Sequence, residues 1–353
     1  MQNNNTMDTP LYTEDIENCL NRTVNLPLLK GKTVLITGAT GMIGSFVVDA
    51  LMHANATCQL NCTVVAMGRS EARAKARFAR HWGKQFFIFA EHDVNAPLPN
   101  ETPRADYVIH SASTTHPVAY ATEPIATITT NIFGTLNLLN YIATQACGAR
   151  MVLTSSVEIY GQNRGDTEYF AEDYCGYIDC NTLRAGYPES KRLSEALCRA
   201  YHKEKGVDFV SARLPRVYGP TLLPSDTKAL SQFIRKGLTG EDIVLKSKGD
   251  QYFSYAYVAD AAAGLLSVML AGKSEEAYNI ADPGSDITLR ELAQLVAEYS
   301  GTALRFELPD SVEQAGYSTA TKAVQDATKL KALGWQPHYD IRNGIARTLA
   351  QFR

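Results

Sequence analysis

Three polar residues, Ser156, Tyr187 and Lys191, have the types and the spacing required for proton transfer that accompanies hydride transfer. Ser156 closes an apolar segment, and Tyr187 and Lys191 follow about thirty residues later. Residues four apart on a helix share a face, so the phenol and the ammonium are expected side by side. A nearby cation favours the phenolate and lowers its pKa from about 10 toward the range of a general base. Ser156 is then predicted to hydrogen-bond the substrate hydroxyl that Tyr187 deprotonates. By itself, a Tyr-x-x-x-Lys pair is equally compatible with a surface Tyr beside a solvated Lys.

A glycine-rich turn near the start of the chain supports the chemical interpretation. An apolar segment, 33–37, runs into a G-x-x-G-x-x-G pattern followed by an apolar helical segment. Glycines permit a tight turn and let backbone N–H groups approach a pyrophosphate at a helix N-terminus. A plain Gly-rich turn is the alternative, but the strand before it and the helix after it are the required context. The residues predicted to bind the dinucleotide are Gly38, Thr40, Gly41, Met42, Ile43 and Gly44.

The end of the second expected strand bears on the type of nicotinamide cofactor. An enzyme that uses NAD usually places an acid there to bind the ribose 2′-hydroxyl, whereas this chain reads Gly68-Arg69-Ser70. Arg69 and Ser70 are predicted to receive the 2′-phosphate of NADP, which favours NADP slightly and leaves NAD open. A solvated Arg at a strand end is the alternative. Asp93 and Val94, after the third strand, are placed to meet the adenine, although Asp93 also fits a surface position.

The elements that must position these residues form an α/β pattern. Strand-like segments at 33–37, 63–67, 86–89, 106–110, 151–154 and 209–213 alternate with helical segments such as 43–53 and 132–145. Such alternation predicts a doubly wound parallel sheet of the Rossmann type. We expect an N-terminal extension at 1–28 with one short helix, a dinucleotide-binding domain at 29–215 with a returning segment at about 255–282, and a smaller interwoven α/β substrate lobe at 216–353.

Composition excludes several other classes of function. The net charge is −3 and basic residues form no block, so nucleic acid is not an expected partner. Seven scattered cysteines fit a reducing compartment, and we expect a cytoplasmic protein without a metal site. The first residues are polar and no apolar run approaches ~20 residues, so neither a signal peptide nor a membrane span is expected.

Further motifs make the chain resemble an extended short-chain dehydrogenase/reductase of the nucleotide-sugar epimerase/dehydratase family, from about Gly31 to the C-terminus. They are the segments 37–44, 110–113, 155–161, 187–191, 218–220, 257–260 and 333–337, together with Asn131. The resemblance implies a Rossmann fold, a nucleotide-sugar substrate and a homodimer. It implies further cofactor contacts from Ser111, Ala112, Ser113, Asn131 and Pro215 besides Tyr187 and Lys191. It implies substrate contacts from Thr115, Ser156, Arg216, Lys228 and Phe253.

The strand-end motif narrows the reaction. Family 4,6-dehydratases carry Thr-Asp-Glu where this chain has Ser156-Val157-Glu158, so the acid that protonates the leaving hydroxyl is absent. UDP-glucuronate decarboxylases also carry a Glu at the position of Glu158, which is therefore a candidate catalytic residue; the alternative is an ordinary strand-end carboxylate. The segment 226–234 resembles a decarboxylase segment, with Lys228 in place of an Arg, although an amphipathic helix with a solvated Lys explains it as well.

Two departures from the family pattern predict a reshaped substrate pocket. Arg216 stands where the family usually has Asn, and Phe253 stands where it usually has an anion-binding Arg. Arg216 and Lys228 are candidates for supplying diphosphate contacts instead. Three hypotheses follow: oxidation of a ring hydroxyl with epimerisation or decarboxylation of the keto intermediate, net reduction of a nucleotide-linked keto sugar or alditol, and a non-catalytic NADP sensor. The Tyr/Lys pair argues against the sensor.

Overall fold

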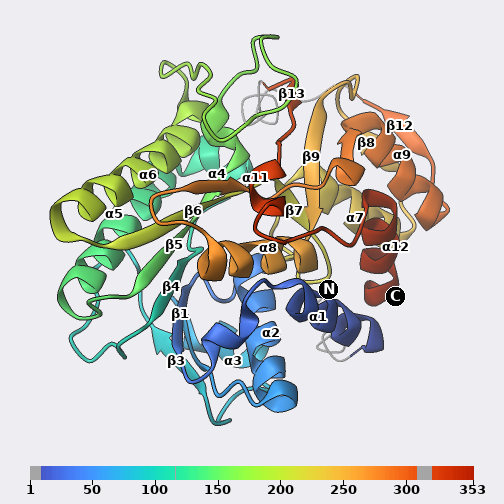
Figure 1. Cartoon of the computed structure of the whole chain (residues 1–353). Helices are drawn as coiled ribbons and strands as arrows, with labels where there is room; N and C mark the ends of the chain where they lie inside the picture. The colour runs from blue at the N-terminus through green and yellow to red at the C-terminus, as the bar shows by residue number, and fades with distance from the viewer. Residues whose placement is uncertain (1–8, 116, 308–319) are drawn as a thin grey trace.

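A parallel sheet organises the larger of two lobes in the computed structural model, which describes residues 9–115, 117–307 and 320–353 (Figure 1). Its seven strands follow the order β10-β6-β5-β4-β1-β2-β3, and every neighbouring pair is parallel. The strands are β1 (Thr33–Thr37), β2 (Thr63–Gly68), β3 (Phe87–Glu91), β4 (Tyr107–His110), β5 (Arg150–Ser156), β6 (Asp208–Leu214) and β10 (Ala277–Asn279). Strand order reverses between β1 and β4, which opens a crevice at their carboxyl ends. The predicted doubly wound α/β fold is confirmed.

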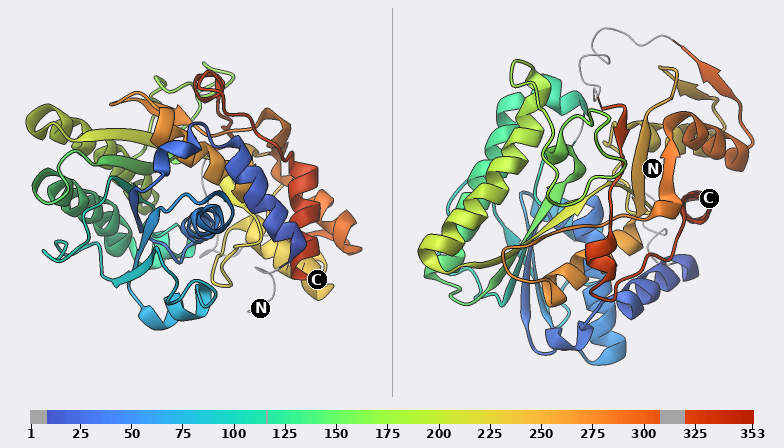
Figure 2. Two further views of the ribbon diagram at one scale, coloured as in Figure 1. Left: turned by 60° about the horizontal axis from the view of Figure 1, so that its bottom comes forward. Right: turned by 45° about the horizontal axis from the view of Figure 1, so that its top comes forward.

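Side-chain alternation along the strands divides the core into two layers. The helices concerned are α2 (Met42–Cys58), α8 (Val258–Ala271), α5 (Pro124–Thr144) and α6 (Gly186–Lys205). In β1, Val34 and Ile36 join the buried cluster that contains residues of α2 and α8, whereas Leu35 joins the cluster with residues of α5 and α6. Successive strand residues point to opposite faces, so a central parallel strand must be apolar throughout. Figure 2 shows the sheet between these helix layers.

The smaller lobe is interwoven with the larger one. The strand β9 (Tyr252–Tyr257) pairs with β7 (Arg216–Tyr218), β11 (Asp286–Thr288) and β13 (Lys322–Ala323), while β8 (Ile243–Leu245) pairs with β12 (Leu304–Phe306). The lobe also contains α7 (Ala229–Thr239), α9 (Leu289–Ser300), α11 (Thr328–Lys331) and α12 (Ile341–Phe352). Because β9 runs directly into α8, and β10 then joins β6, the chain returns to the large sheet as expected.

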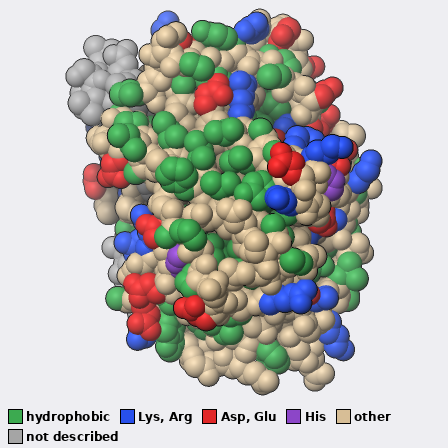
Figure 3. All heavy atoms as spheres, turned by 90° about the vertical axis from the view of Figure 1, so that its left-hand side faces the viewer, with side chains coloured by type: hydrophobic (Ala, Val, Ile, Leu, Met, Phe, Trp, Pro, Cys, Tyr) green, Lys and Arg blue, Asp and Glu red, His purple; other side chains and the backbone are tan. Residues whose placement is uncertain are grey.

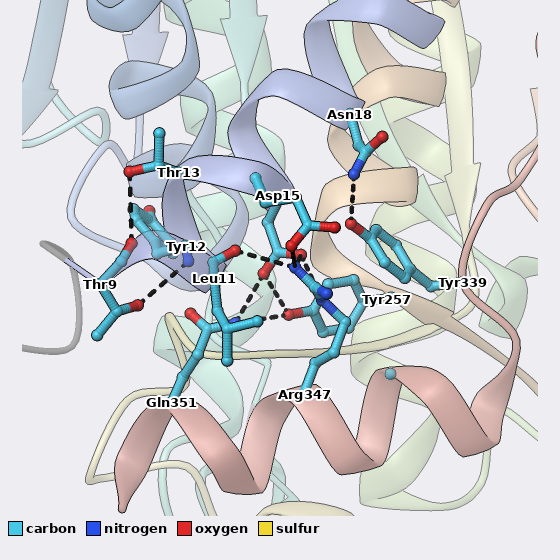
Figure 4. A network of polar contacts seen from close by, with 12 residues as sticks. Thr9, Leu11, Tyr12, Thr13, Asp15, Asn18, Tyr257, Tyr339, Arg347 and Gln351 are labelled. Carbon is cyan, nitrogen blue, oxygen red and sulfur yellow. Dashed lines mark hydrogen bonds and ion pairs between the residues drawn. The ribbon is translucent and has the colours of Figure 1, made fainter.

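The N-terminal helix α1 (Pro10–Arg22) is the short helix expected within the extension 1–28. It fastens the lobes to each other through two buried carboxylates, of which Figure 4 shows Asp15 and its partners. Asp15 accepts hydrogen bonds from Tyr257 (2.6 Å) at the end of β9 and from Arg347 (2.8 Å) of α12. On the other side, the Tyr12 hydroxyl donates to Asp49 of α2 at 2.6 Å. The polar side chains of Tyr12 and Asp15 on α1 are therefore buried and bind residues of other elements.

Short helices and turns complete the edge of the large sheet at the carboxyl ends of its strands, where the candidate site residues lie. They are α3 (Glu71–Arg77), α4 (Pro117–Thr122) and the 3₁₀ turns η3 (Val157–Tyr160) and η4 (Leu183–Ala185). Two further 3₁₀ turns, η2 (Leu26–Leu29) and η5 (Pro283–Ser285), lie elsewhere. α3 and α4 follow β2 and β4, whereas η3 continues β5 without an intervening loop. Because η3 follows β5 directly, it sets the orientation of residues 157–160, which come after Ser156.

Candidate active site

The glycine turn between β1 and α2 has the shape that a pyrophosphate requires. Gly38 has a φ of +64°, and a Cβ there would meet the Ala112 backbone nitrogen at 2.7 Å. A Cβ on Gly44 would meet the Gly38 carbonyl oxygen at 2.5 Å. The turn therefore packs directly on the end of β4, and the N–H groups of the first turn of α2, including those of Met42 and Ile43, have no partner within the helix. These features fit a dinucleotide.

One cleft collects most of the predicted cofactor residues, which lie on four different strand ends. Those lining it are Gly38, Thr40, Gly41, Arg69, Ser70, Asp93, Val94, Ser111, Ala112 and Ser113. Ser70 caps α3, because its Oγ accepts a hydrogen bond from the backbone N–H of Arg73 at 3.2 Å. Arg73 lines the same cleft and was not predicted from the sequence. Asp93 is exposed and accepts hydrogen bonds from Asn95, which holds its own turn.

Asn131 connects the cofactor edge to the catalytic helix. It is fully buried on α5, its Oδ1 accepts from Ser113 at 2.8 Å, and its Nδ2 donates to Ser190 of α6 at 2.9 Å. These two bonds fix the distance between the end of β4 and the helix that carries Tyr187. A cofactor contact by Asn131 remains a prediction, as it does for Pro215, which is buried between β6 and β7.

Ser156, Tyr187 and Lys191 come together as predicted. Ser156 is the last residue of β5, its Oγ accepts a hydrogen bond from the backbone N–H of Glu158 at 3.2 Å, and it is near enough to Tyr187 to lower the pKa of that phenol. Lys191 is buried, and its ammonium donates to the Thr154 carbonyl oxygen at 2.8 Å. Burial lowers the pKa of Lys191 to about 8, and Glu195 partly opposes that effect. The cation is thus held beneath the strand end by a backbone carbonyl.

The Tyr187 pKa was expected to be lowered by the Lys191 ammonium together with a positive nicotinamide ring, and in the protein alone it is raised instead. Burial raises this pKa to about 12; the Ser156 hydrogen bond and the Arg184 guanidinium lower it, and the Glu158 carboxylate raises it. Lys191 is not among the groups that shift it, because its ammonium points to the Thr154 carbonyl oxygen. The four-residue spacing on α6 predicted that Tyr187 and Lys191 lie near each other. It did not predict that burial raises the Tyr187 pKa.

Glu158 reaches the site because the chain turns directly after Ser156. Glu158 lies in η3, and its carboxylate binds the Arg184 guanidinium of η4 at 2.6 Å. Arg184 also lies over the ring of Tyr120, 4.6 Å from its centre, and Tyr120 stacks on Tyr187 with 4.9 Å between ring centres. Glu158, Arg184 and Tyr120 therefore form a layer against the catalytic phenol.

The predicted substrate residues fall into three environments. Arg216 of β7 lies flat on the Phe253 ring, with its guanidinium carbon 3.4 Å from the ring centre. Lys228 instead pairs with the buried Asp226 at 2.8 Å. Thr115 lies in the half-buried segment between β4 and α4. The cation and the ring that replace the family pattern are therefore in contact, which the sequence did not predict, and the substrate contacts of Thr115, Arg216, Lys228 and Phe253 stay predictions.

Comparison with known proteins identifies the group to which this fold and site belong. Residues 34–281 match the NAD dependent epimerase/dehydratase family. The chain belongs to this family. It is 32% identical over 321 residues to UDP-glucuronic acid decarboxylase 5 of Arabidopsis thaliana, a match that covers 91% of this chain and 89% of the relative.

Solved structures agree with this assignment. A dTDP-glucose 4,6-dehydratase from Streptomyces venezuelae, solved with NAD, superposes with a TM-score of 0.76 at 25% identity over 90% of this chain and 96% of the other. A UDP-glucuronic acid 4-epimerase from Bacillus cereus, also solved with NAD, gives a TM-score of 0.77 at 20% identity over 91% and 98%. Neighbours on this fold thus bind nicotinamide dinucleotides, and the residues of this epimerase/dehydratase family member fit one.

Two site residues of this family member escaped sequence reasoning. Tyr120 lies in a short helix without a motif, and Arg184 precedes Tyr187 by three residues in a segment of mixed polarity. The position of Arg184 immediately before the Tyr/Lys helix was the available signal. Among residues 9–115, 117–307 and 320–353, no three His, Cys, Asp or Glu side chains gather as a metal site, and no helix is long and apolar enough to cross a membrane.

Proposed function

We propose that this protein oxidises a ring hydroxyl of a nucleotide-linked sugar, transforms the resulting keto sugar by epimerisation or decarboxylation, and then reduces it again. The meeting of Ser156, Tyr187 and the buried Lys191 at the edge of a dinucleotide-shaped cleft is the observation that carries this proposal. A bound nicotinamide supplies the hydride acceptor and the returning hydride. Relatives named as UDP-glucuronic acid decarboxylases support UDP-glucuronate as the first substrate to test.

The protein's own residues supply the proton chemistry. Ser156 positions the substrate hydroxyl against Tyr187, whose phenolate takes the proton as the carbon loses its hydride. Burial raises the Tyr187 pKa to about 12, and the positive charge of a bound, oxidised nicotinamide would favour that phenolate and offset the rise. On the return step Tyr187 gives the proton back. Each group therefore ends the cycle in its starting protonation state.

Glu158 is proposed to act on the keto sugar between the two hydride steps. It is held at 2.6 Å from Arg184 next to Tyr120, one residue layer away from the phenol. Val157 is apolar and buried, so Glu158 is the residue of η3 able to assist proton transfer at a distal carbon. Its ion pair with Arg184 holds the carboxylate in place beside Tyr120.

Turnover with a trace of cofactor tests this function. UDP-glucuronate is incubated with the enzyme and one-hundredth of an equivalent of NAD or NADP, and the sugar signals are followed by NMR. Conversion of many substrate molecules per cofactor, to a pentose or to the C4 epimer, is expected. Conversion limited to the amount of added cofactor would support the second candidate function, net reduction or dehydrogenation.

NADP is proposed with a slight preference over NAD, and a second cation in the cleft supports that preference. Arg69 and Arg73 both line the cleft beside Ser70, and both are exposed. No acid occupies the end of β2 to bind a ribose 2′-hydroxyl. Two guanidinium groups suit a 2′-phosphate, whose contact is charge-assisted. This arrangement also favours the net-reduction alternative, because exchangeable NADPH suits reductions.

A homodimer through α5 and α6 is proposed from the outer face of these helices. The 21 residues of α5 include no charged side chain. Ile125 (77% exposed) and Phe133 (46%) on α5, and Leu193 (45%) on α6, lie on the surface. Figure 3 shows hydrophobic side chains gathered on this side of the molecule. An apolar, uncharged helix face such as that of α5, with Leu193 of α6 beside it, is typical of a protein interface.

Size measurement tests the homodimer. Phe133→Glu places a charge at the centre of the proposed interface and should convert a dimer into a monomer in multi-angle light scattering. Phe306→Glu is the matched control, since Phe306 is 54% exposed in the other lobe. A monomeric wild-type protein would contradict the proposal.

The seven cysteines are all free, which supports a cytoplasmic location.

A further inference from the structure

A buried carboxylate lies one helical turn beyond Lys191 on α6. Glu195 follows Lys191 by four residues, and both side chains are buried. Residues at this spacing share one face of a helix, with Cβ atoms about 5–6 Å apart, and opposite charges there attract each other. The Lys191 ammonium nevertheless donates to the Thr154 carbonyl oxygen at 2.8 Å, at the end of β5. The Glu195 carboxylate is bound elsewhere.

Arg213 of β6 occupies both oxygens of that carboxylate. Its Nε donates to Oε1 of Glu195 at 3.1 Å, and its Nη2 donates to Oε2 at 2.8 Å. The remaining nitrogen, Nη1, donates to the Tyr160 hydroxyl at 3.0 Å and to the Glu172 carbonyl oxygen at 2.6 Å. Every nitrogen of the guanidinium therefore has an acceptor, which fixes its plane against the carboxylate. Such geometry is what a buried ion pair requires to offset its desolvation.

The other titratable groups around the Lys191 ammonium are uncharged. Burial and the Lys191 charge lower the pKa of His110 on β4 to about 3, so this imidazole is neutral. Burial raises the pKa of Tyr187 to about 12 and also raises that of Cys198, so both keep their protons. Among the residues that the structure describes, Glu195 is therefore the group whose pairing decides where the ammonium turns.

We propose that Arg213 is a positioning residue, which withholds the Glu195 carboxylate from Lys191 so that the ammonium stays turned toward the strand end that carries Ser156. This inference rests on the proposed function, in which Lys191 belongs to the catalytic group. Without Arg213, a carboxylate and an ammonium buried on one helix face would pair, because pairing offsets the desolvation of both. The ammonium would then leave its place at the end of β5.

Replacing Arg213 by Met removes the competing cation and keeps a long side chain. The Lys191 signal is followed by NMR in protein labelled at the lysine ε-carbon, and it is assigned by its absence from Lys191→Met. Burial holds the Lys191 pKa at about 8 in the wild-type protein. In Arg213→Met this pKa should rise to about 10 or higher, because a freed carboxylate favours the ammonium. The first hydride step with UDP-glucuronate, followed as absorbance at 340 nm, should slow at least about tenfold.

A second substitution separates positioning from a structural effect. In Arg213→Met/Glu195→Gln no carboxylate is left to draw the ammonium away, so the Lys191 pKa should return to about 8 or below. The hydride step should recover to within about threefold of wild type, whereas structural damage would remain or add up. Removing both members of a buried pair costs little stability, so this variant should fold even if Arg213→Met does not. In that case Arg213→Lys, which binds one carboxylate oxygen, should give a smaller rise in the Lys191 pKa.

Arg150→Met is the matched control. Arg150 pairs with Asp208 at 2.7 Å across the same two strands, β5 and β6, at their amino ends. The Lys191 pKa should stay unchanged in this variant. A Lys191 pKa that stays unchanged in Arg213→Met, or in Arg213→Lys if only that variant folds, would overturn the inference, as would a double variant as slow as the single one. If the wild-type protein shows no hydride step with UDP-glucuronate but the Lys191 pKa responds as described, the proposed function fails while the positioning of Lys191 is supported.

Discussion

Replacing Glu158 by Gln separates the two stages of the proposed reaction. Glu158 binds Arg184 at 2.6 Å, and the two side chains are only 22% and 14% exposed. Gln keeps the size and one acceptor oxygen but removes the charge. A hydrogen bond to a charged group contributes about 1.5–3 kcal/mol, so the free energy of unfolding should fall by about that amount. The fold should survive, because Arg184 also packs on Tyr120.

The kinetic effect should fall mainly on the step after oxidation. Ser156, Tyr187 and Lys191 remain, so cofactor absorbance at 340 nm should still rise when substrate is added. Loss of an acid or base at the keto stage should slow product formation by ~10²–10⁴-fold. Glu158 also raises the pKa of Tyr187, so its neutralisation lowers that pKa. The pH profile of the first hydride step should therefore move to lower pH.

Stopped-flow absorbance and NMR of the product measure the two stages separately. Glu189→Gln is the matched control, since Glu189 pairs with Arg192 at 3.5 Å on the same helix as Tyr187 and is 38% exposed. That control should keep both rates within a factor of two. Product formation at the wild-type rate in Glu158→Gln would refute the catalytic role of Glu158. Equal loss of both stages would refute the division between them.

Three further outcomes follow from the site and the core. Tyr187→Phe should reduce turnover by ~10²–10⁴-fold in a product assay while cofactor affinity stays nearly unchanged, and activity within threefold of wild type would remove Tyr187 as the base. Arg69→Ala should weaken NADP binding by about 1–3 kcal/mol in calorimetry but leave NAD binding unaltered, whereas equal effects would remove the case for NADP. Burial alone would raise the pKa of Asp49, but Arg77, His81 and Arg80 hold it well below its ordinary range. Its contribution to stability is therefore present above the unfolded value of about 3.9 and lost as pH falls below it. Asp49→Asn should cost about 3–5 kcal/mol in denaturant unfolding at pH 7, and a cost that does not shrink toward pH 2 would contradict this account.

Periodic patterns made most of the fold predictable. Segments such as 63–67 and 252–257 are apolar or aromatic over a strand's length, and the structure has β2 and β9 there. A Thr followed three residues later by a Glu is a local signal for the start of a helix, and Thr288 and Glu291 form the capping box that begins α9. By contrast, α5 begins at Pro124, eight residues before the predicted start, because its first turns are short polar and apolar residues without a clear period. Local signals therefore located elements better than their ends.

Motif spacing predicted the core of the site for a similar physical reason. Ser156, Tyr187 and Lys191 are fixed by one strand end and one helix, whose geometries are regular. The contacts of Tyr120, Arg184 and Arg73 depend on how irregular segments fold over that edge, and nothing in the local sequence specifies it. The local sequence also does not specify how deeply these side chains are buried. The rise in the Tyr187 pKa and the unpaired Nη1 of Arg216 are therefore seen only in the structure.

A deuterium label at C4 of the sugar tests most directly whether the hydride is borrowed and returned. The wild-type enzyme, unlabelled cofactor and C4-deuterated UDP-glucuronate are incubated to completion, and the nucleotide-sugar product and the cofactor are analysed by mass spectrometry and NMR. We predict that the deuterium is found at C4 of the epimerised or decarboxylated product, with no net change in the cofactor's oxidation state. Deuterium that instead accumulates in a stoichiometric amount of reduced cofactor, beside an oxidised sugar, would contradict the proposed cycle.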